Sequence, residues 1–188
     1  MPEPGLPPAL VIERVVLLGY MTSGKSAVGL ALARRLEWAF LDFDVEIEHR
    51  AGATVKEIIG AEGEERFREM EAALTAEVAD RPGIVLAPGG GWITRPEQLD
   101  LLGSRTLSVW LRVSVDETVR RLRMDSIDRP FRDHPDPRPL IAEMLAEREP
   151  LYRLADLSVP AEGRSAESVA FEIETIVRTR REAVGVNG

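Results

Sequence analysis

The chain has 188 residues, of which 44% are hydrophobic and 30% charged, so its composition is that of an ordinary globular domain. This length suffices for one domain with a sizeable core and is short for two. The net charge of −8 argues against a protein that wraps nucleic acid, and the lack of cysteine excludes disulfides, thiol nucleophiles and thiolate metal sites. No apolar run approaches membrane-spanning length, and residues 1–8, which carry no positive charge and lead into no long apolar stretch, do not predict a signal peptide. We therefore expect a cytoplasmic protein with no membrane or nucleic-acid partner.

Strands and helices are predicted to alternate along the chain. An apolar, β-branched run predicts a buried strand over Val11–Gly19, and the apolar spacing after it predicts a helix over Gly24–Leu36. Further strands are predicted at Ala39–Asp44, Ile84–Ala87, Leu107–Val113 and Leu157–Val159. Further helices are predicted at Asp44–Arg50, from a capping box at Thr54–Glu57, and at Gly63–Asp80, Pro96–Leu102, Ser114–Arg123, Pro139–Glu149 and Ser165–Arg180.

This alternation predicts an α/β protein, a three-layer α/β/α sandwich around a five-stranded parallel sheet. We expect one domain over residues 11–182, with a disordered tail at 1–10 and a second tail at 183–188. Residues 124–138 are rich in proline and charge and predict a long loop. Pro150 is expected to interrupt the helix that begins at Pro139.

The segment Gly19–Ser26 fits the pattern G-x-x-x-x-G-K-[ST]. It follows a predicted buried strand and opens a predicted helix, the context in which this pattern forms a phosphate-binding loop. Backbone N–H groups of the loop and of the helix N-terminus would then converge on an anion. Lys25 would reach the β- and γ-phosphates of a nucleoside triphosphate, and the Ser26 hydroxyl would ligate Mg²⁺. The alternative is a plain glycine turn with a solvated Lys25.

Two acidic residues follow the second predicted strand. A strand would place Asp42 and Asp44 on one side of the chain, at the carboxyl edge of the sheet where ligands bind. One carboxylate could hold Mg²⁺ through water while the other takes or orients the proton of an attacking hydroxyl. The spacing equally allows Asp44 to be the N-cap of the next helix.

Other candidates have an ordinary structural reading beside the functional one. Gly89–Gly91 would let a small ligand touch the backbone, or form a flexible turn. Arg68 could bind an anion, or belong to a solvated helix ion-pair face. Arg148 could be a cation at a helix C-terminus, and Arg129 a surface charge on the long loop.

Taken together, these residues resemble shikimate kinase, one of the small P-loop kinases built like nucleoside monophosphate kinases. The resemblance runs from about Val15 to about Val159, in matching order and spacing. It is carried by Gly19–Ser26, Leu41–Glu48, Gly63–Glu71, Gly89–Gly91, Asp128–Pro130 and Arg148–Tyr152. The Asp-x-Asp, Phe-Arg-x-x-Glu and Arg-x-Pro-Leu-Tyr pieces are more specific to this family than the phosphate loop.

The resemblance implies a P-loop kinase fold with a mobile lid at about 124–138, ATP and shikimate as substrates, and Mg²⁺. It implies transfer of phosphate to the 3-hydroxyl of shikimate, a step of chorismate and aromatic amino acid biosynthesis; a monomer is expected. The implied catalytic residues are Lys25, Asp44 and Arg129. The implied ATP-binding residues are Thr22, Ser23, Gly24, Lys25, Ser26, Ala27, Arg121, Arg129 and Arg164. The implied shikimate-binding residues are Asp44, Arg68, Gly90, Gly91 and Arg148, and the implied metal-site residues are Ser26 and, through water, Asp42.

The chain departs from the family pattern at several places. Thr22-Ser23 replaces a glycine-containing pair in the phosphate loop, Arg129-Pro-Phe-Arg132 replaces the usual lid sequence, and Trp92 replaces a smaller residue after the glycine run. Arg132 could share the phosphate role of Arg129, and Trp92 could narrow the pocket floor or pack away from it. Two rival functions stay open: another small-molecule kinase of this architecture, such as a gluconate kinase, and a non-catalytic nucleotide-binding module.

Overall fold

The computed structural model describes residues 11–125 and 131–185, with side chains up to Arg180. Its sheet has five parallel strands in the order β2-β3-β1-β4-β5. The strands are β1 (Arg14–Leu18), β2 (Ala39–Asp42), β3 (Ile84–Ala87), β4 (Thr106–Arg112) and β5 (Leu157–Pro160). The predicted five-stranded parallel sheet is confirmed.

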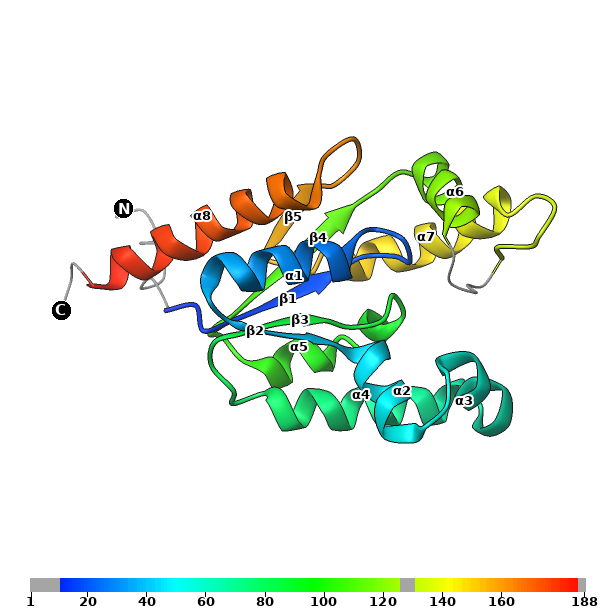
Figure 1. The fold of residues 1–188 in the computed structure, drawn as a ribbon, viewed down its shortest axis with the longest axis horizontal. Helices are drawn as coiled ribbons and strands as arrows, with labels where there is room; N and C mark the ends of the chain where they lie inside the picture. Colours follow the sequence, from blue (N-terminus) through cyan, green and yellow to red (C-terminus); the bar gives the residue numbers. More distant parts are fainter. Residues whose placement is uncertain (1–10, 126–130, 186–188) are drawn as a thin grey trace, which may run out of the picture.

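Helices connect the strands and flank the sheet (Figure 1). They are α1 (Lys25–Leu36), α2 (Phe43–Ala51), α3 (Val55–Glu62), α4 (Glu64–Val78), the 3₁₀ helix η1 (Trp92–Thr94), α5 (Glu97–Leu102), α6 (Val115–Met124), α7 (Arg138–Tyr152) and α8 (Ala166–Gly185). Residues 1–10, predicted to be a disordered tail, lie outside the described ranges.

The two faces of the sheet carry separate hydrophobic cores. Alternate residues of β1 point to opposite faces, so Val15 and Leu17 pack against α1 and α8, whereas Val16 and Leu18 pack against α4 and the C-terminal end of α7. The three-layer sandwich is therefore confirmed. A third, smaller cluster of Tyr20, Leu122 and Ile141 lies where the loop after β1 meets α6 and α7.

Local signals place several helix boundaries as predicted. Thr54 and Glu57 form the expected capping box of α3, each side chain accepting from the other residue's backbone N–H. The Ser114 hydroxyl accepts from the backbone N–H of Glu117 at the start of α6. The helix α6 ends at Met124 and α7 begins at Arg138, at the bounds predicted for the proline- and charge-rich loop, of which residues 126–130 lie outside the described ranges.

Two predicted helix ends were wrong. Pro150 does not interrupt α7, which continues to Tyr152. Pro150 lies in the last turn, and buried Tyr152, stacked on Trp110 with ring centroids 5.8 Å apart, holds that turn against the sheet. The last helix extends to Gly185 rather than Arg180, so residues 183–185, predicted as tail, are helical.

Candidate active site

The phosphate loop connects β1 to α1 with alternating backbone conformations. Gly24 has φ 96°, and Thr22 has φ 60° although it is β-branched. Such alternation turns successive N–H groups toward one concavity, the arrangement that binds anions. The Lys25 ammonium donates to the carbonyl oxygens of Gly19 at 2.7 Å and Tyr20 at 3.1 Å. The lysine thus folds back over its own loop, with its charge at the concavity.

Two loop hydroxyls have no hydrogen-bond partner among the residues that the structure describes. They are Thr22 Oγ1 and Ser23 Oγ, both buried. Buried polar atoms in folded proteins are nearly always paired, so such orphans mark a place where a polar ligand belongs. A nucleotide triphosphate, rich in acceptor oxygens, is a ligand that this loop fits.

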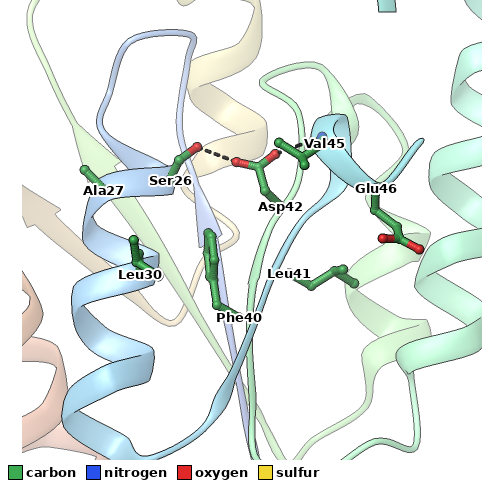
Figure 2. Close-up of a pocket in the computed structure, with 8 residues that line it drawn as sticks. All are labelled: Ser26, Ala27, Leu30, Phe40, Leu41, Asp42, Val45 and Glu46. Atoms are coloured by element: carbon green, nitrogen blue, oxygen red, sulfur yellow. Dashed lines mark hydrogen bonds between the residues drawn. The ribbon is translucent and has the colours of Figure 1, made fainter. Parts of the chain in front are cut away.

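A candidate metal site lies where α1 and β2 come together. The Ser26 hydroxyl donates to Asp42 Oδ2 at 2.5 Å, and Figure 2 shows the two side chains pointing toward each other beside an open pocket of about 480 Å³. A hydroxyl and a carboxylate next to a phosphate loop suit Mg²⁺, which keeps several waters and takes few protein oxygens. Within residues 11–125 and 131–185, no group of three or more acidic or histidine side chains is placed to hold a metal.

The two aspartates after β2 do not share one face of a strand as predicted. The strand ends at Asp42, whose Oδ1 accepts from the backbone N–H of Asp44 at 3.2 Å and of Val45 at 3.5 Å. Asp42 is therefore the N-cap of α2, and the suggestion that Asp44 is the cap was wrong. Asp44 lies in the first helical turn, close to the glycine run.

Each glycine of the run after β3 leaves room for a different part of the site. A Cβ on Gly90 would lie 3.1 Å from the backbone nitrogen of Met21 in the phosphate loop. A Cβ on Gly91 would collide with the guanidinium group of Arg68. The run therefore brings the phosphate loop and Arg68 together at the carboxyl edge of the sheet.

The first glycine of the run lies against two carboxylates. A Cβ on Gly89 would approach Glu71 Oε1 to 2.8 Å and Asp44 Oδ1 to 3.1 Å. Burial raises the pKa of Glu71; the charge of Arg68 opposes that rise, and the charge of Asp44 adds to it. Sequence reasoning assigned no role to Glu71, although it is the Glu of the Phe-Arg-x-x-Glu piece.

Arg68 is held from both sides by acidic residues of its own helix. Its guanidinium donates to Glu71 at 2.5 Å and to Glu64 at 2.7 Å, and 12% of its side chain is exposed. The pairing with Glu64 and Glu71 agrees with the predicted ion-pair face of a helix. The burial of the Arg68 side chain, however, shows that this face is not solvated at Arg68. This ion pair points the arginine toward Gly91 instead of toward bulk water.

Arg148 comes from α7 on the other side of the site. Its guanidinium carbon lies 5.6 Å from the centre of the Tyr20 ring. The Tyr152 hydroxyl donates to the Gly90 carbonyl at 2.6 Å. Burial raises the pKa of Tyr152, and the charges of Arg148 and Arg68 both oppose that rise. Two guanidinium groups from different helices thus act on one phenol that touches the glycine run.

Arg121 and Arg164 line a second pocket of about 170 Å³, together with loop residues Ser23 and Gly24. Arg121 donates to the carbonyl oxygens of Thr22 and Ala161, each at 3.1 Å. This pocket adjoins the phosphate loop on the α8 side and includes Ala27 in its lining. Its position fits the nucleoside part of a nucleotide.

The remaining predictions concern the lid and the glycine-run tryptophan. Arg129 lies outside the described residues. Trp92 is buried, and its indole N–H donates to Thr75 Oγ1 at 3.0 Å, so it packs into the core beneath the site. Tyr20 was not predicted as a site residue, because the loop motif leaves its position open. Tyr152 ends the Arg-x-Pro-Leu-Tyr motif, but nothing in the sequence indicates its contact with Gly90.

The fold and the loop together define a P-loop kinase, a parallel α/β protein with a nucleotide site at the carboxyl edge of its sheet. The family model for shikimate kinase matches residues 21–178. The shikimate kinase of Moorella thermoacetica is 41% identical over 170 residues, covering 90% of this chain and 97% of the relative. That of Halorhodospira halophila is 44% identical over 162 residues, covering 86% and 91%. The chain belongs to the shikimate kinase family and is an ATP-dependent kinase with an alcohol group as acceptor.

Solved structures agree with this assignment. The shikimate kinase from Acinetobacter baumannii in complex with shikimate has a TM-score of 0.82 and 33% identity, covering 90% of this chain and 95% of that one. A gluconokinase from Sinorhizobium meliloti has a TM-score of 0.63 at 17% identity, a likeness of fold alone.

Among the helices of the described residues, none has both the length and the hydrophobicity needed to cross a bilayer.

Proposed function

We propose that this chain transfers the γ-phosphate of ATP to the 3-hydroxyl of shikimate, with the phosphate loop as donor site and the residues around Gly90 as acceptor site. The observation that carries the proposal is the convergence of Arg68 and Arg148 near Tyr152, whose hydroxyl contacts the Gly90 carbonyl. Gly90 in turn packs against the phosphate loop. Shikimate is a small carboxylate with several hydroxyls, and two guanidinium groups offer a fork for its charge.

The residues of the donor side position and neutralise the triphosphate. Lys25 already lies over the loop concavity, from which its ammonium can turn to the β- and γ-phosphates. Ser26 would hold Mg²⁺ directly and Asp42 through water, and the bound metal would offset phosphate charge. Phosphoryl transfer needs positioning and charge neutralisation more than covalent chemistry, and these residues supply both. Arg121 and Arg164 would border the adenine.

Asp44 is the carboxylate proposed to orient the attacking hydroxyl or accept its proton. Its position beside Gly89 and Glu71 puts it next to the proposed acceptor. A base must lie within hydrogen-bond reach of the proton that it removes, and the position of Asp44 in the first turn of α2, close to the glycine run, supports this role. Arg129 would reach the phosphates from the lid, and the lid would exclude water.

The test is a coupled ADP-release assay with purified protein and Mg-ATP, supplied with shikimate, gluconate or no acceptor at equal concentration. We expect release that depends on shikimate. Faster release with gluconate would indicate the rival kinase. ATP binding without release for either acceptor would indicate a non-catalytic module. Phosphorus NMR of the product then identifies the esterified hydroxyl.

The assembly state and location are proposed from the sequence. A monomer of 20.8 kDa should elute as such in gel filtration with light scattering, with and without nucleotide. A cytoplasmic location is part of the proposal, and cell fractionation tests it.

A further inference from the structure

Tyr20 occupies an open position of the phosphate-loop pattern, directly after Gly19, yet only 3% of it is exposed. Any residue type satisfies the pattern here, so the loop geometry does not demand a tyrosine. The contacts of the buried ring should therefore explain why a tyrosine occupies this position.

The backbone of Tyr20 belongs to the nucleotide side of the site. Its carbonyl oxygen accepts from the Lys25 ammonium at 3.1 Å and from the Ser23 backbone N–H at 3.2 Å. A triphosphate that takes hold of Lys25 competes for this ammonium. Nucleotide binding therefore changes the hydrogen bonding of the peptide group that carries the Tyr20 ring.

The side chain of Tyr20 contacts Arg148, one of the two arginines proposed to bind the shikimate carboxylate. The guanidinium carbon of Arg148 lies 5.6 Å from its ring centre, within the range of a cation–π interaction. Its hydroxyl donates to the sulfur of Met144 at 3.0 Å, one turn before Arg148 on α7. Burial raises the pKa of Tyr20 to about 12, and the charge of Arg148 opposes that rise, as expected for a buried phenol close to this guanidinium.

The surroundings of the ring link it to the connection between α6 and α7. Tyr20 forms a buried cluster with Leu122 of α6 and Ile141 of α7, and Phe131 packs against this cluster. A packed cluster transmits a shift of one member to the others because it has little free volume. Tyr20 therefore packs the phosphate loop against α6 and against the helix that carries Arg148.

We propose that Tyr20 is a positioning residue that couples the nucleotide site to the acid site, its backbone engaging Lys25 and its ring holding the Arg148 guanidinium. The proposal rests on the proposed function, in which Arg148 binds the shikimate carboxylate. Nucleotide binding and shikimate binding are then coupled through Tyr20, and by linkage each ligand changes the affinity for the other by the same factor.

The experiment is titration calorimetry of shikimate into the protein alone and into the protein saturated with Mg-ADP, with the reverse titration of ADP as a check. The ratio of the two shikimate dissociation constants measures the coupling, and couplings between sites are typically about 5- to 150-fold. We expect a ratio different from one in the wild type and in Tyr20→Phe, which keeps the ring.

In Tyr20→Leu the ratio should move toward one, shikimate alone should bind several-fold more weakly, and ADP alone should bind as in the wild type. Phe171→Leu is the matched control: it removes a ring from under Arg35, 5.0 Å away, on an exposed part of α8, and should leave the ratio unchanged. Tyr20→Met, a ringless residue of similar length, gives the same test should the leucine variant not fold.

The outcomes separate the two proposals. Shikimate binding with a wild-type ratio in the ringless variants, or a wild-type ratio of one, overturns the coupling role and leaves the proposed function standing. No shikimate binding by the wild type overturns the proposed function, and the coupling role with it.

Discussion

The phosphate loop and the side of the site proposed to bind shikimate meet at Gly90 but are built in different ways. The loop draws its groups from one continuous segment, Gly19–Ser26, and mainly from the backbone. The proposed shikimate side draws single side chains from separate elements, Arg68 from α4 and Arg148 from α7, with Gly91 against the guanidinium of Arg68. Backbone groups fixed by local dihedrals tolerate changes of side chain, whereas a clamp of side chains depends on every partner that aims it.

Removal of Arg68 or Arg148 should have the largest effect on shikimate binding, because few other groups are proposed to bind the carboxylate. Arg68→Ala should weaken shikimate binding by about 2–5 kcal/mol, the range for losing one partner of a buried charged contact. Arg148→Ala should behave alike, and ATP binding should be spared in both.

The measurement is the KM for each substrate together with the dissociation constant of shikimate. Arg66→Ala is the matched control, because Arg66 is on the same helix, half exposed, and pairs with the surface glutamates Glu62 and Glu69. An unchanged shikimate KM in both clamp variants contradicts the proposed clamp.

Removing the loop lysine should act on turnover. Lys25→Ala should lower kcat by about 10²–10³-fold, the range for losing one group that stabilises transition-state charge, while shikimate binding persists. Steady-state ADP release and calorimetry measure the two effects separately. Lys56→Ala, at the only other lysine of the chain, is the control and should keep wild-type kcat. Wild-type turnover in Lys25→Ala would remove the loop from the catalytic site.

A methyl group on Gly91 should weaken shikimate binding without affecting ATP binding. Gly91→Ala inserts a Cβ where the Arg68 guanidinium lies, at a backbone φ of −93° that alanine accepts, so the effect is one of packing. Overpacking of this kind costs about 1–3 kcal/mol, and we expect it as weaker shikimate binding with unchanged ATP binding.

Gly60→Ala is the control for Gly91→Ala. Gly60 lies in α3 with open space around it, so alanine there should stabilise the fold by about 0.4–1 kcal/mol. Equal effects of the two alanine substitutions on shikimate binding would argue that the packing of Arg68 against Gly91 does not matter for this binding.

The smallest effect concerns strain in the loop. Thr22 adopts φ 60°, which costs a residue with a Cβ about 1–2 kcal/mol. Thr22→Gly should raise the free energy of unfolding by up to about 1 kcal/mol, because glycine's greater freedom in the unfolded chain offsets part of the relief. Urea denaturation measures it. Ser23→Gly, next along the loop at a position without positive φ, should instead destabilise.

Several features of the fold were readable from local sequence. The strand–helix alternation, the capping box at Thr54 and the glycine-rich loop each state a local preference that the structure follows. The helix ends were harder, because a distant contact decided them. Pro150 predicts a break, but the packing of Tyr152 against Trp110 carries α7 one further turn.

What the sequence alone determined is the sheet, the phosphate loop and, through motif spacing, the family. Tertiary structure alone decided that Asp42 caps α2 while accepting from Ser26, that Gly91 seats Arg68, and that Tyr20 lies under Arg148. The physical reason is the distance in sequence over which each kind of interaction acts. Backbone conformation and capping depend on residues a few positions apart, whereas each of these contacts joins side chains whose separation in space is set by the packing of whole helices on the sheet.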